Sequence, residues 1–228
     1  MVLRLISSAA LLAAVSAVTG SAFAAVSPLR LLSSALAAAH AQRSVHYVMT
    51  QTSPGRTVTI VGDAAIDRGI QRNTYRNGAH AGHVTVVVAA NTAYVRGDAF
   101  TLTNYMGFPA AAAAAYAGRW LALAHTAPDF KTVAAAVRLG STIDELKMPQ
   151  PFTSTGAATV QGTRVAGIQS QFSRGGQRIT ETLYVRATGS PLPVEQTARG
   201  ATIQLKITLS DWNEPVEVSA PTHALPIR

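Results

Sequence analysis

The stretch Thr202-Ile-Gln-Leu-Lys-Ile-Thr-Leu209 decides the fold class. Its apolar residues alternate one by one with polar residues, and in an extended chain successive side chains point to opposite faces. One face therefore carries only apolar side chains, namely Ile203, Leu205, Ile207 and Leu209. The pattern predicts a strand with one face on a core and the other in solvent, as in an antiparallel sheet.

The same period of two recurs on both sides of the middle of the chain. It runs through residues 45–49, 58–66, 70–76, 84–89 and 92–95, and again through 158–160, 165–172, 179–186 and 192–197. Turn-forming residues separate several of these segments, as at Ser53-Pro54-Gly55, Asn77-Gly78 and Ala90-Asn91. We predict about ten antiparallel strands, and a sheet of that size curls strongly.

Helical patterns precede and interrupt the strands. Ser27-Pro28, followed by leucines at helical spacing, predicts an opening helix over about residues 28–42. A helical insert is predicted over about residues 98–148, between the two sets of strands. The order of strands, helices and strands predicts an α+β fold in which the helices cover the apolar face of the sheet.

Local signals place three helices within the insert. An Ala-rich helix opens at Phe108-Pro109, and a second helix opens at Pro128-Asp129 and ends at Gly140. Ser141 with Asp144 has the spacing of a capping box, which predicts the start of a short third helix.

The first 24 residues predict a secretory signal. The positive charge of Arg4 precedes an apolar stretch from Leu5 to about Val18, and Ala22-Phe-Ala24 places small residues at a cleavage site. Cleavage after Ala24 leaves residues 25–228 as a single domain in a secreted or cell-envelope compartment.

Composition excludes several function classes. Hydrophobic residues make up 48% and charged residues 13% of the chain, so it is too apolar to be intrinsically disordered. It contains no cysteine, which excludes disulfides, thiol catalysis and lipid attachment through an N-terminal cysteine. The formal charge of +8 attracts anions, and an anionic membrane surface is a candidate partner. The arginines do not form a stripe interleaved with aromatics, so we expect no nucleic-acid binding.

Reaction motifs are missing from the sequence. It contains no phosphate-binding loop, dinucleotide fingerprint, nucleophile elbow or metalloprotease helix, and we predict neither enzymatic activity nor a cofactor. A hydrolase would need a polar cleft around a histidine such as His125. His80 and His83 are the best metal candidates, although only His40 and His46 could join them in space. We interpret them as turn residues and predict no metal site.

Aromatic residues concentrate in or beside the insert. Two interpretations are open: the insert packs solidly on the sheet, or its small alanines leave a cavity that long side chains do not fill. If a cavity exists, its predicted lining from the strands is Val58, Ile60, Val86 and Val88. Its predicted lining from the insert is Phe100, Tyr105, Phe108, Tyr116, Trp120, Phe130 and Val133.

Short motifs spread over residues 27–223 carry a family resemblance. They are Val61-Gly-Asp-Ala-Ala-Ile66, Thr85-Val-Val-Val88 with Ala93-Tyr-Val-Arg96, Trp120, and above all Leu209-Ser-Asp-Trp-Asn-Glu-Pro-Val-Glu-Val-Ser-Ala-Pro221. With them the sequence resembles the LppX/LprG group of mycobacterial envelope lipoproteins and, more distantly, the LolA-type lipoprotein carriers. The resemblance implies a half-barrel of strongly curved antiparallel sheet, with helices over its concave face and acyl chains or lipoglycans held between.

One departure from that group concerns its membrane anchor. Its lipoproteins carry an acylated cysteine at the cleavage site, where this chain has Ala24-Ala25. We therefore predict a diffusible, monomeric carrier of lipids or acylated molecules that is not lipid-anchored. The alternative is an extracytoplasmic interaction or sensor module with a filled core. A cavity smaller than about 300 Å³, the low end for ligand pockets, would favour that alternative.

Overall fold

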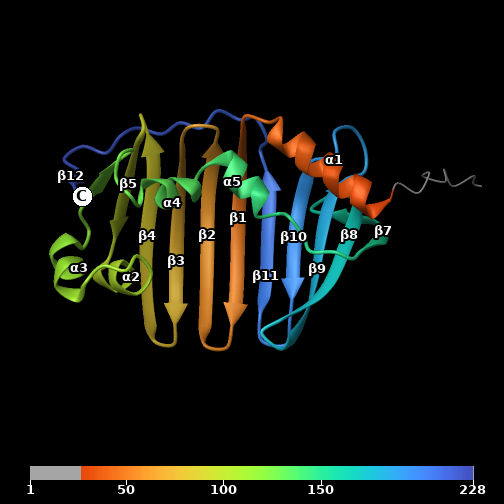
Figure 1. Cartoon of the computed structure of the whole chain (residues 1–228), viewed down its shortest axis with the longest axis horizontal. Coiled ribbons are helices and arrows are strands. Elements are labelled where there is room, and N and C mark those ends of the chain that lie inside the picture. The colour runs from red at the N-terminus through yellow and green to blue at the C-terminus, as the bar shows by residue number, and fades with distance from the viewer. Residues whose placement is uncertain (1–26, 228) are drawn as a thin grey trace, which may run out of the picture.

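The computed structural model describes residues 27–227, and the predicted signal peptide lies outside this range. A single curved, unclosed sheet forms the frame (Figure 1). Its twelve strands lie in the order β12-β6-β5-β4-β3-β2-β1-β11-β10-β9-β8-β7. The α+β half-barrel prediction is confirmed, with more strands than expected.

Two antiparallel meanders make up the sheet. The first consists of β1 (Ser44–Ser53), β2 (Arg56–Ala65), β3 (Gly69–Asn77), β4 (His80–Ala89), β5 (Thr92–Gly97) and β6 (Leu121–Ala124). The second consists of β7 (Phe152–Val160), β8 (Thr163–Arg174), β9 (Gln177–Arg186), β10 (Pro193–Arg199) and β11 (Gln204–Ser210). They join where β1 pairs with β11, with Tyr47 opposite Leu209.

The predicted hairpin turns are confirmed. β1 and β2 are joined at Pro54-Gly55, and β3 and β4 at Gly78, whose φ is +57°. Ala90 and Asn91 both have positive φ, 47° and 62°, as a tight hairpin with right-handed strand twist requires. Local turn chemistry therefore fixes the register of the first meander.

Five helices accompany the sheet. They are α1 (Pro28–His40), α2 (Ala99–Asn104), α3 (Ala110–Tyr116), α4 (Phe130–Ala135) and α5 (Leu139–Asp144). The Ser27 hydroxyl caps α1 by accepting from the Arg30 N–H, as the sequence predicts. α5 begins at Leu139 rather than after Ser141, because the preceding residue Arg138 already forms a bridge with Ala65 of β2.

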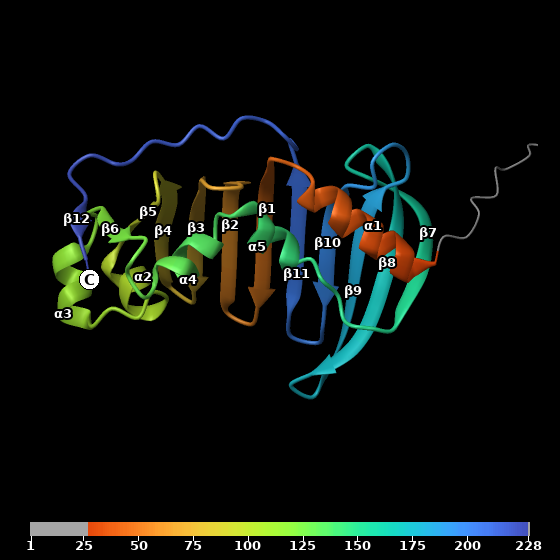
Figure 2. The same cartoon turned by 45° about the horizontal axis from the view of Figure 1, so that its top comes forward.

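The insert crosses the inner face of the sheet from one edge to the other. It leaves β6, passes over the first meander as α4 and α5, and enters β7 at the opposite edge (Figures 1 and 2). It also contains β6, so it is not wholly helical as predicted. α1 packs over β7, β8 and β10 of the second meander.

The C-terminal segment returns along the ends of the strands. After β11 it runs past the first meander and forms β12 (Leu225–Pro226), which pairs in parallel with β6 (Figure 1). At the other edge β7 is mostly exposed and carries a register irregularity between Ser154 and Gly156, whose φ is +83°. One edge of the sheet is thus covered by the end of the chain, and the other is bent.

Three clusters of buried side chains form the core. The first joins β4, β5 and β6 to α2, α3 and α4. The second joins β1, β2 and β11 to α1 and α5, and the third joins α1 to β8 and β9. No helix within residues 27–227 is long and apolar enough to cross a membrane.

Candidate functional site

The strand register places the predicted sheet residues on one face. Val86 lies opposite Gln71 of β3 and Val95 of β5, and the same face continues through Val88. On β2 it carries Val58 and Ile60. This is the inner, concave face, because α4 and α5 pack on it.

A cavity lies between this inner face and the insert. Its volume is about 380 Å³, and it is bounded by β3, β4, β5 and β6 on one side and by α4 and the loop after α2 on the other. Its lining residues are Gln71, Asn73, Val86, Val95, Tyr105, Met106, Phe108, Leu123, Asp129, Thr132, Val133, Ala136 and Ile227. A neighbouring hollow of about 400 Å³ shares five of them and extends toward Pro109 and Tyr116. We call the two hollows together the insert cavity.

The predicted lining residues differ in where the structure places them. Val86, Tyr105, Phe108 and Val133 line the smaller hollow, and Phe108 and Tyr116 line the larger. Val88 and Phe130 are buried in the adjoining core cluster, and Val58 and Ile60 lie on the same face further along the sheet. Phe100 stacks at 5.7 Å on His80 at the end of the strands.

Trp120 is placed on the opposite side of the sheet. It directly precedes Leu121, which lies on the inner face opposite Val95, so its own side chain points outward. There it helps to line a separate outer-face hollow. The expectation that it faces the concave side is corrected by this register.

Two amide side chains on β3 form a polar floor of the cavity. Gln71 and Asn73 are only 6% and 8% exposed, and both line the cavity. Asn73 Nδ2 donates to the Tyr75 hydroxyl at 3.3 Å. Within the described residues, Gln71 Oε1 and Asn73 Oδ1 have no hydrogen-bond partner. Buried acceptors without a donor are costly, so these two oxygens are the least satisfied polar atoms of the cavity lining.

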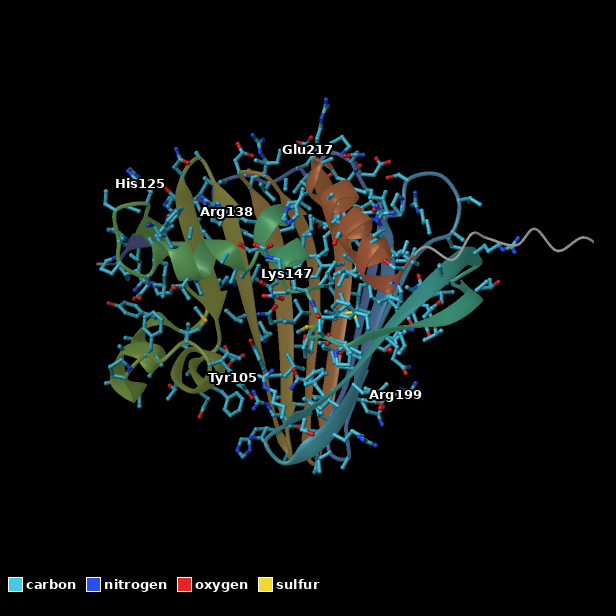
Figure 3. The ribbon with its side chains drawn as sticks, turned by 45° about the vertical axis from the view of Figure 1, so that its right-hand side comes forward. Tyr105, His125, Arg138, Lys147, Arg199 and Glu217 are labelled. Atoms are coloured by element: carbon cyan, nitrogen blue, oxygen red, sulfur yellow. The ribbon has the colours of Figure 1, made fainter. Side chains whose placement is uncertain are left out.

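Aromatic rings cluster around Tyr105, which lines the cavity. Tyr105, labelled in Figure 3, stacks on Tyr75 with ring centroids 3.7 Å apart. Phe100 meets Tyr105 edge-on at 5.9 Å, and the Arg56 guanidinium lies 5.1 Å from the Tyr105 centroid. Burial raises the pKa of Tyr75, so its hydroxyl stays protonated at neutral pH.

Residues 136–138 form one of the contacts that hold the insert against the sheet. The Tyr47 hydroxyl donates to the Ala136 carbonyl at 2.9 Å, and burial raises the pKa of this phenol. Tyr47 reaches that carbonyl by passing over Gly62, where a Cβ atom would collide with its ring. Gly69 of β3 allows the Val137 backbone to approach in the same way. The insert therefore touches the sheet here, while the cavity lies between this point and β6.

Sequence reasoning missed the amide floor. Residues 70–76 show the alternation of a strand, and Arg72 and Arg76 must face solvent in a sheet with one buried face. That requirement places Gln71 and Asn73 on the inner face. The alternation of residues 70–76 thus already indicates these two positions, although the prediction included only apolar and aromatic residues in the cavity lining.

The histidines considered as metal ligands have other roles. His80 stacks on Phe100, and His83 Nδ1 lies 3.3 Å from Asp98 Oδ2. Within residues 27–227 no group of three or more histidine, aspartate or glutamate side chains is placed to share an ion. His125 lies in the exposed turn after β6, far from Tyr105 (Figure 3).

Comparison with known proteins places this architecture among solved folds. No family model and no curated protein matches the sequence. The structure of LprF from Mycobacterium bovis is similar with a TM-score of 0.55 and 16% identity, over 85% of this chain and 96% of that one. Lipoprotein LppX from Mycobacterium tuberculosis is similar with a TM-score of 0.50 and 18% identity, over 84% and 98% of the two chains. The chain therefore has the fold of the mycobacterial LprF and LppX structures, as the sequence resemblance implied.

Proposed function

We propose that this protein is a non-enzymatic, extracytoplasmic carrier or binding protein that holds the acyl chain of a lipid in the insert cavity. The observation that carries the proposal is the cavity of about 380 Å³ between the apolar inner face and the insert. This volume lies above the roughly 300 Å³ at which ligand pockets begin, and this favours a ligand site over a module with a filled core. The shared fold with lipoprotein LppX supports the same assignment.

Hydrophobic transfer supplies the binding energy in this mechanism. Removing methylene groups from water contributes about 0.8 kcal/mol each, so a dozen methylenes contribute about 10 kcal/mol before the costs of ordering and association. Val86, Val95 and Leu123 from the strands and Val133 from α4 provide the apolar walls. No reacting group is needed, because the ligand is held and released unchanged.

The amide floor adds a requirement on the ligand. Gln71 and Asn73 offer acceptor oxygens that lack a donor within the described part of the chain. A hydroxyl or amide N–H on the lipid, next to its chain, would satisfy them. We therefore expect a lipid that joins an apolar chain to a hydrogen-bond donor to bind more tightly than a fatty acid, whose carboxylate offers no donor.

The test compares uptake by matched variants. Native mass spectrometry of protein purified from its own envelope should detect a lipid adduct, and the delipidated protein should take up a fluorescent fatty acid. Val133→Phe, which fills the cavity, should weaken uptake at least about tenfold, or about 1.4 kcal/mol. Val61→Phe is the matched control, because Val61 lies on the outer face of β2 opposite Arg72.

Two results would overturn the proposal. One is protein that carries no adduct and takes up no fatty acid. The other is an equal loss of uptake in both phenylalanine variants, which would place the binding outside the insert cavity. N-terminal sequencing of the exported protein tests the predicted cleavage after Ala24 in the same preparation.

A further inference from the structure

A second and larger hollow lies on the outer face of the first meander. Its volume is about 810 Å³, and it is walled on one side by β3, β4 and β5. Glu217–Pro221 of the returning C-terminal segment form the other wall. We call it the strap pocket, because the C-terminal segment lies across it.

Two guanidinium groups flank the floor of the strap pocket. Arg72 lies opposite Thr85, and Thr85 lies opposite Arg96, so the three residues form one row across β3, β4 and β5. Two strand spacings separate the arginines by about 10 Å at the backbone, a gap that two arginine side chains can bridge toward one ligand. The Arg96 guanidinium lies 6.0 Å from the Trp120 ring centroid, which favours a fixed position for it.

The arginines have no carboxylate partner in the described structure. No ion pair involving Arg72 or Arg96 occurs within residues 27–227. Their positive charge is therefore not neutralised by a direct ion pair. On the outer face of a chain with a formal charge of +8, this row is a cationic site, and Asp98 and Glu217 also line the pocket.

The nearby carboxylates are engaged elsewhere. Asp98 accepts hydrogen bonds from the backbone N–H groups of His83 and Thr101, the second at 2.8 Å. Burial acts to raise the pKa of Asp98, but these bonds outweigh it and lower the pKa. Glu217 belongs to the strap, and its charge acts on Arg68, which itself pairs with Asp67 at 3.1 Å. Figure 3 places Glu217 at the upper end of the molecule.

We propose that the strap pocket binds a phosphate group, with Arg72 and Arg96 as its principal ligands and the Thr85 hydroxyl between them. A planar guanidinium forms paired hydrogen bonds to phosphate oxygens, and two of them match a doubly charged anion. Ile70 and buried Val87 supply an apolar patch beside the arginines. The volume leaves room for the rest of a phosphate ester, so both a free phosphate compound and a lipid headgroup carry the required chemistry.

This site is independent of the insert cavity. It lies on the other face of the sheet and shares no lining residue with the cavity. Arg72→Gln/Arg96→Gln therefore should not change fatty-acid uptake. If uptake is absent from the wild-type protein while phosphate binds, only the proposed carrier function is lost.

The experiment measures the binding of two phosphate sources by the full chain. Inorganic phosphate is titrated calorimetrically, and vesicles of phosphatidylcholine with or without phosphatidic acid are tested by co-sedimentation. Arg72→Gln/Arg96→Gln should weaken binding at least about tenfold, because both guanidinium groups lose their charge-assisted hydrogen bonds to the phosphate. Arg76→Gln is the matched control, since Arg76 lies further along the same face of β3 and does not line the pocket. It should change binding less than about twofold.

Each outcome has a defined meaning. Saturable inorganic phosphate binding that is lost in the double variant supports the site with a free phosphate compound as its ligand. Binding to phosphatidic acid vesicles alone, lost in the same variant, supports the site with a lipid headgroup. Equal losses in the double variant and Arg76→Gln, or no binding of either probe, overturn the proposal. Circular dichroism and thermal melting confirm that the variants fold.

Discussion

The two halves of the sheet are covered by helices of different composition, and the insert cavity lies in the half formed by the first meander. Over β8 and β9, α1 presents leucines that pack with Ile168, Leu183 and Val185 into a buried cluster. Over β4 and β5, the insert presents short helices, one of them six alanines followed by a tyrosine, and a hollow remains. The length of the covering side chains, more than the curvature of the sheet, therefore decides where this fold contains a cavity.

The buried polar groups differ between the halves in the same way. In the second meander, Gln196 Nε2 donates to Glu181 Oε1 at 2.8 Å and lies 3.4 Å from the Leu146 carbonyl. In the first meander, Gln71 and Asn73 have acceptor oxygens without such donors. The Gln196–Glu181 pair of the second meander is thus satisfied internally, whereas Gln71 and Asn73 of the first meander keep acceptor oxygens without a donor.

The largest expected effect comes from removing a large buried side chain from the second meander. Leu183 is 0% exposed, and Leu183→Ala should reduce the free energy of unfolding by about 2–5 kcal/mol, because it leaves a void among rigid neighbours. Chemical denaturation monitored by tryptophan fluorescence measures this. Leu29→Ala, at a leucine that is 52% exposed, should change stability by less than about 0.5 kcal/mol. A loss below about 1 kcal/mol for Leu183→Ala would contradict tight packing in this half.

The next test makes the same substitution, alanine to leucine, in both halves of the sheet. Ala35 in α1 is 0% exposed within the filled cluster, and Ala35→Leu should destabilise the protein by about 1–3 kcal/mol through overpacking. Ala136 lines the insert cavity, so Ala136→Leu should change stability by less than about 0.5 kcal/mol while it weakens fatty-acid uptake. Equal destabilisation by Ala35→Leu and Ala136→Leu would show that the two halves are packed equally tightly.

The smallest expected effect is the pH dependence of stability that arises from Glu181, the partner of Gln196 in the second meander. Burial raises the pKa of Glu181 to about 7, so the native state favours the protonated carboxyl. This stabilisation is complete below the ordinary pKa near 4.5 and is lost as pH rises to about 7. We expect a loss of about 1–2 kcal/mol over this interval, below the full linkage value because some water still reaches the carboxyl.

Glu181→Gln isolates that contribution from the histidines that titrate in the same interval. The amide keeps an acceptor for Gln196 but does not titrate, so its stability curve should be flatter than that of the wild type between pH 4.5 and 7.5. Parallel curves for the two proteins would show that Glu181 does not carry the pH dependence.

Sequence reasoning succeeded where local chemistry decides the structure. The alternation in Ile203–Leu209 and the turn at Ala90-Asn91 each act over a few residues, and both appear in the fold as predicted. The capped opening helix follows the same rule. The curvature of the sheet followed from the number of strands, which is itself a sum of local signals.

The elements that were missed depend on distant partners. Leu121–Ala124 is a short apolar stretch in a helical context, and it becomes β6 only because β5 pairs with it. The two residues of β12 have no strand signal of their own and are positioned by β6. The outward side of Trp120 follows from the register of β6, so it could not be read from the insert alone.

The candidate site was predictable to a similar depth. The aromatic and aliphatic walls follow from clustering and alternation, and several of the expected residues line the insert cavity. The amide floor was missed because apolar character was taken as the only criterion for a cavity. The arginine row of the strap pocket needs the register of three strands, which composition does not contain.

The unequal treatment of the two sheet edges bears on self-association. An open sheet offers unpaired backbone groups at its rims, and these can template the addition of another molecule and start fibrils. Here the tail of the chain occupies one rim through β12, while the irregularity at Gly156 distorts the other and leaves it poor in large side chains. Both edges of this open sheet are thereby protected against pairing with other copies of the chain.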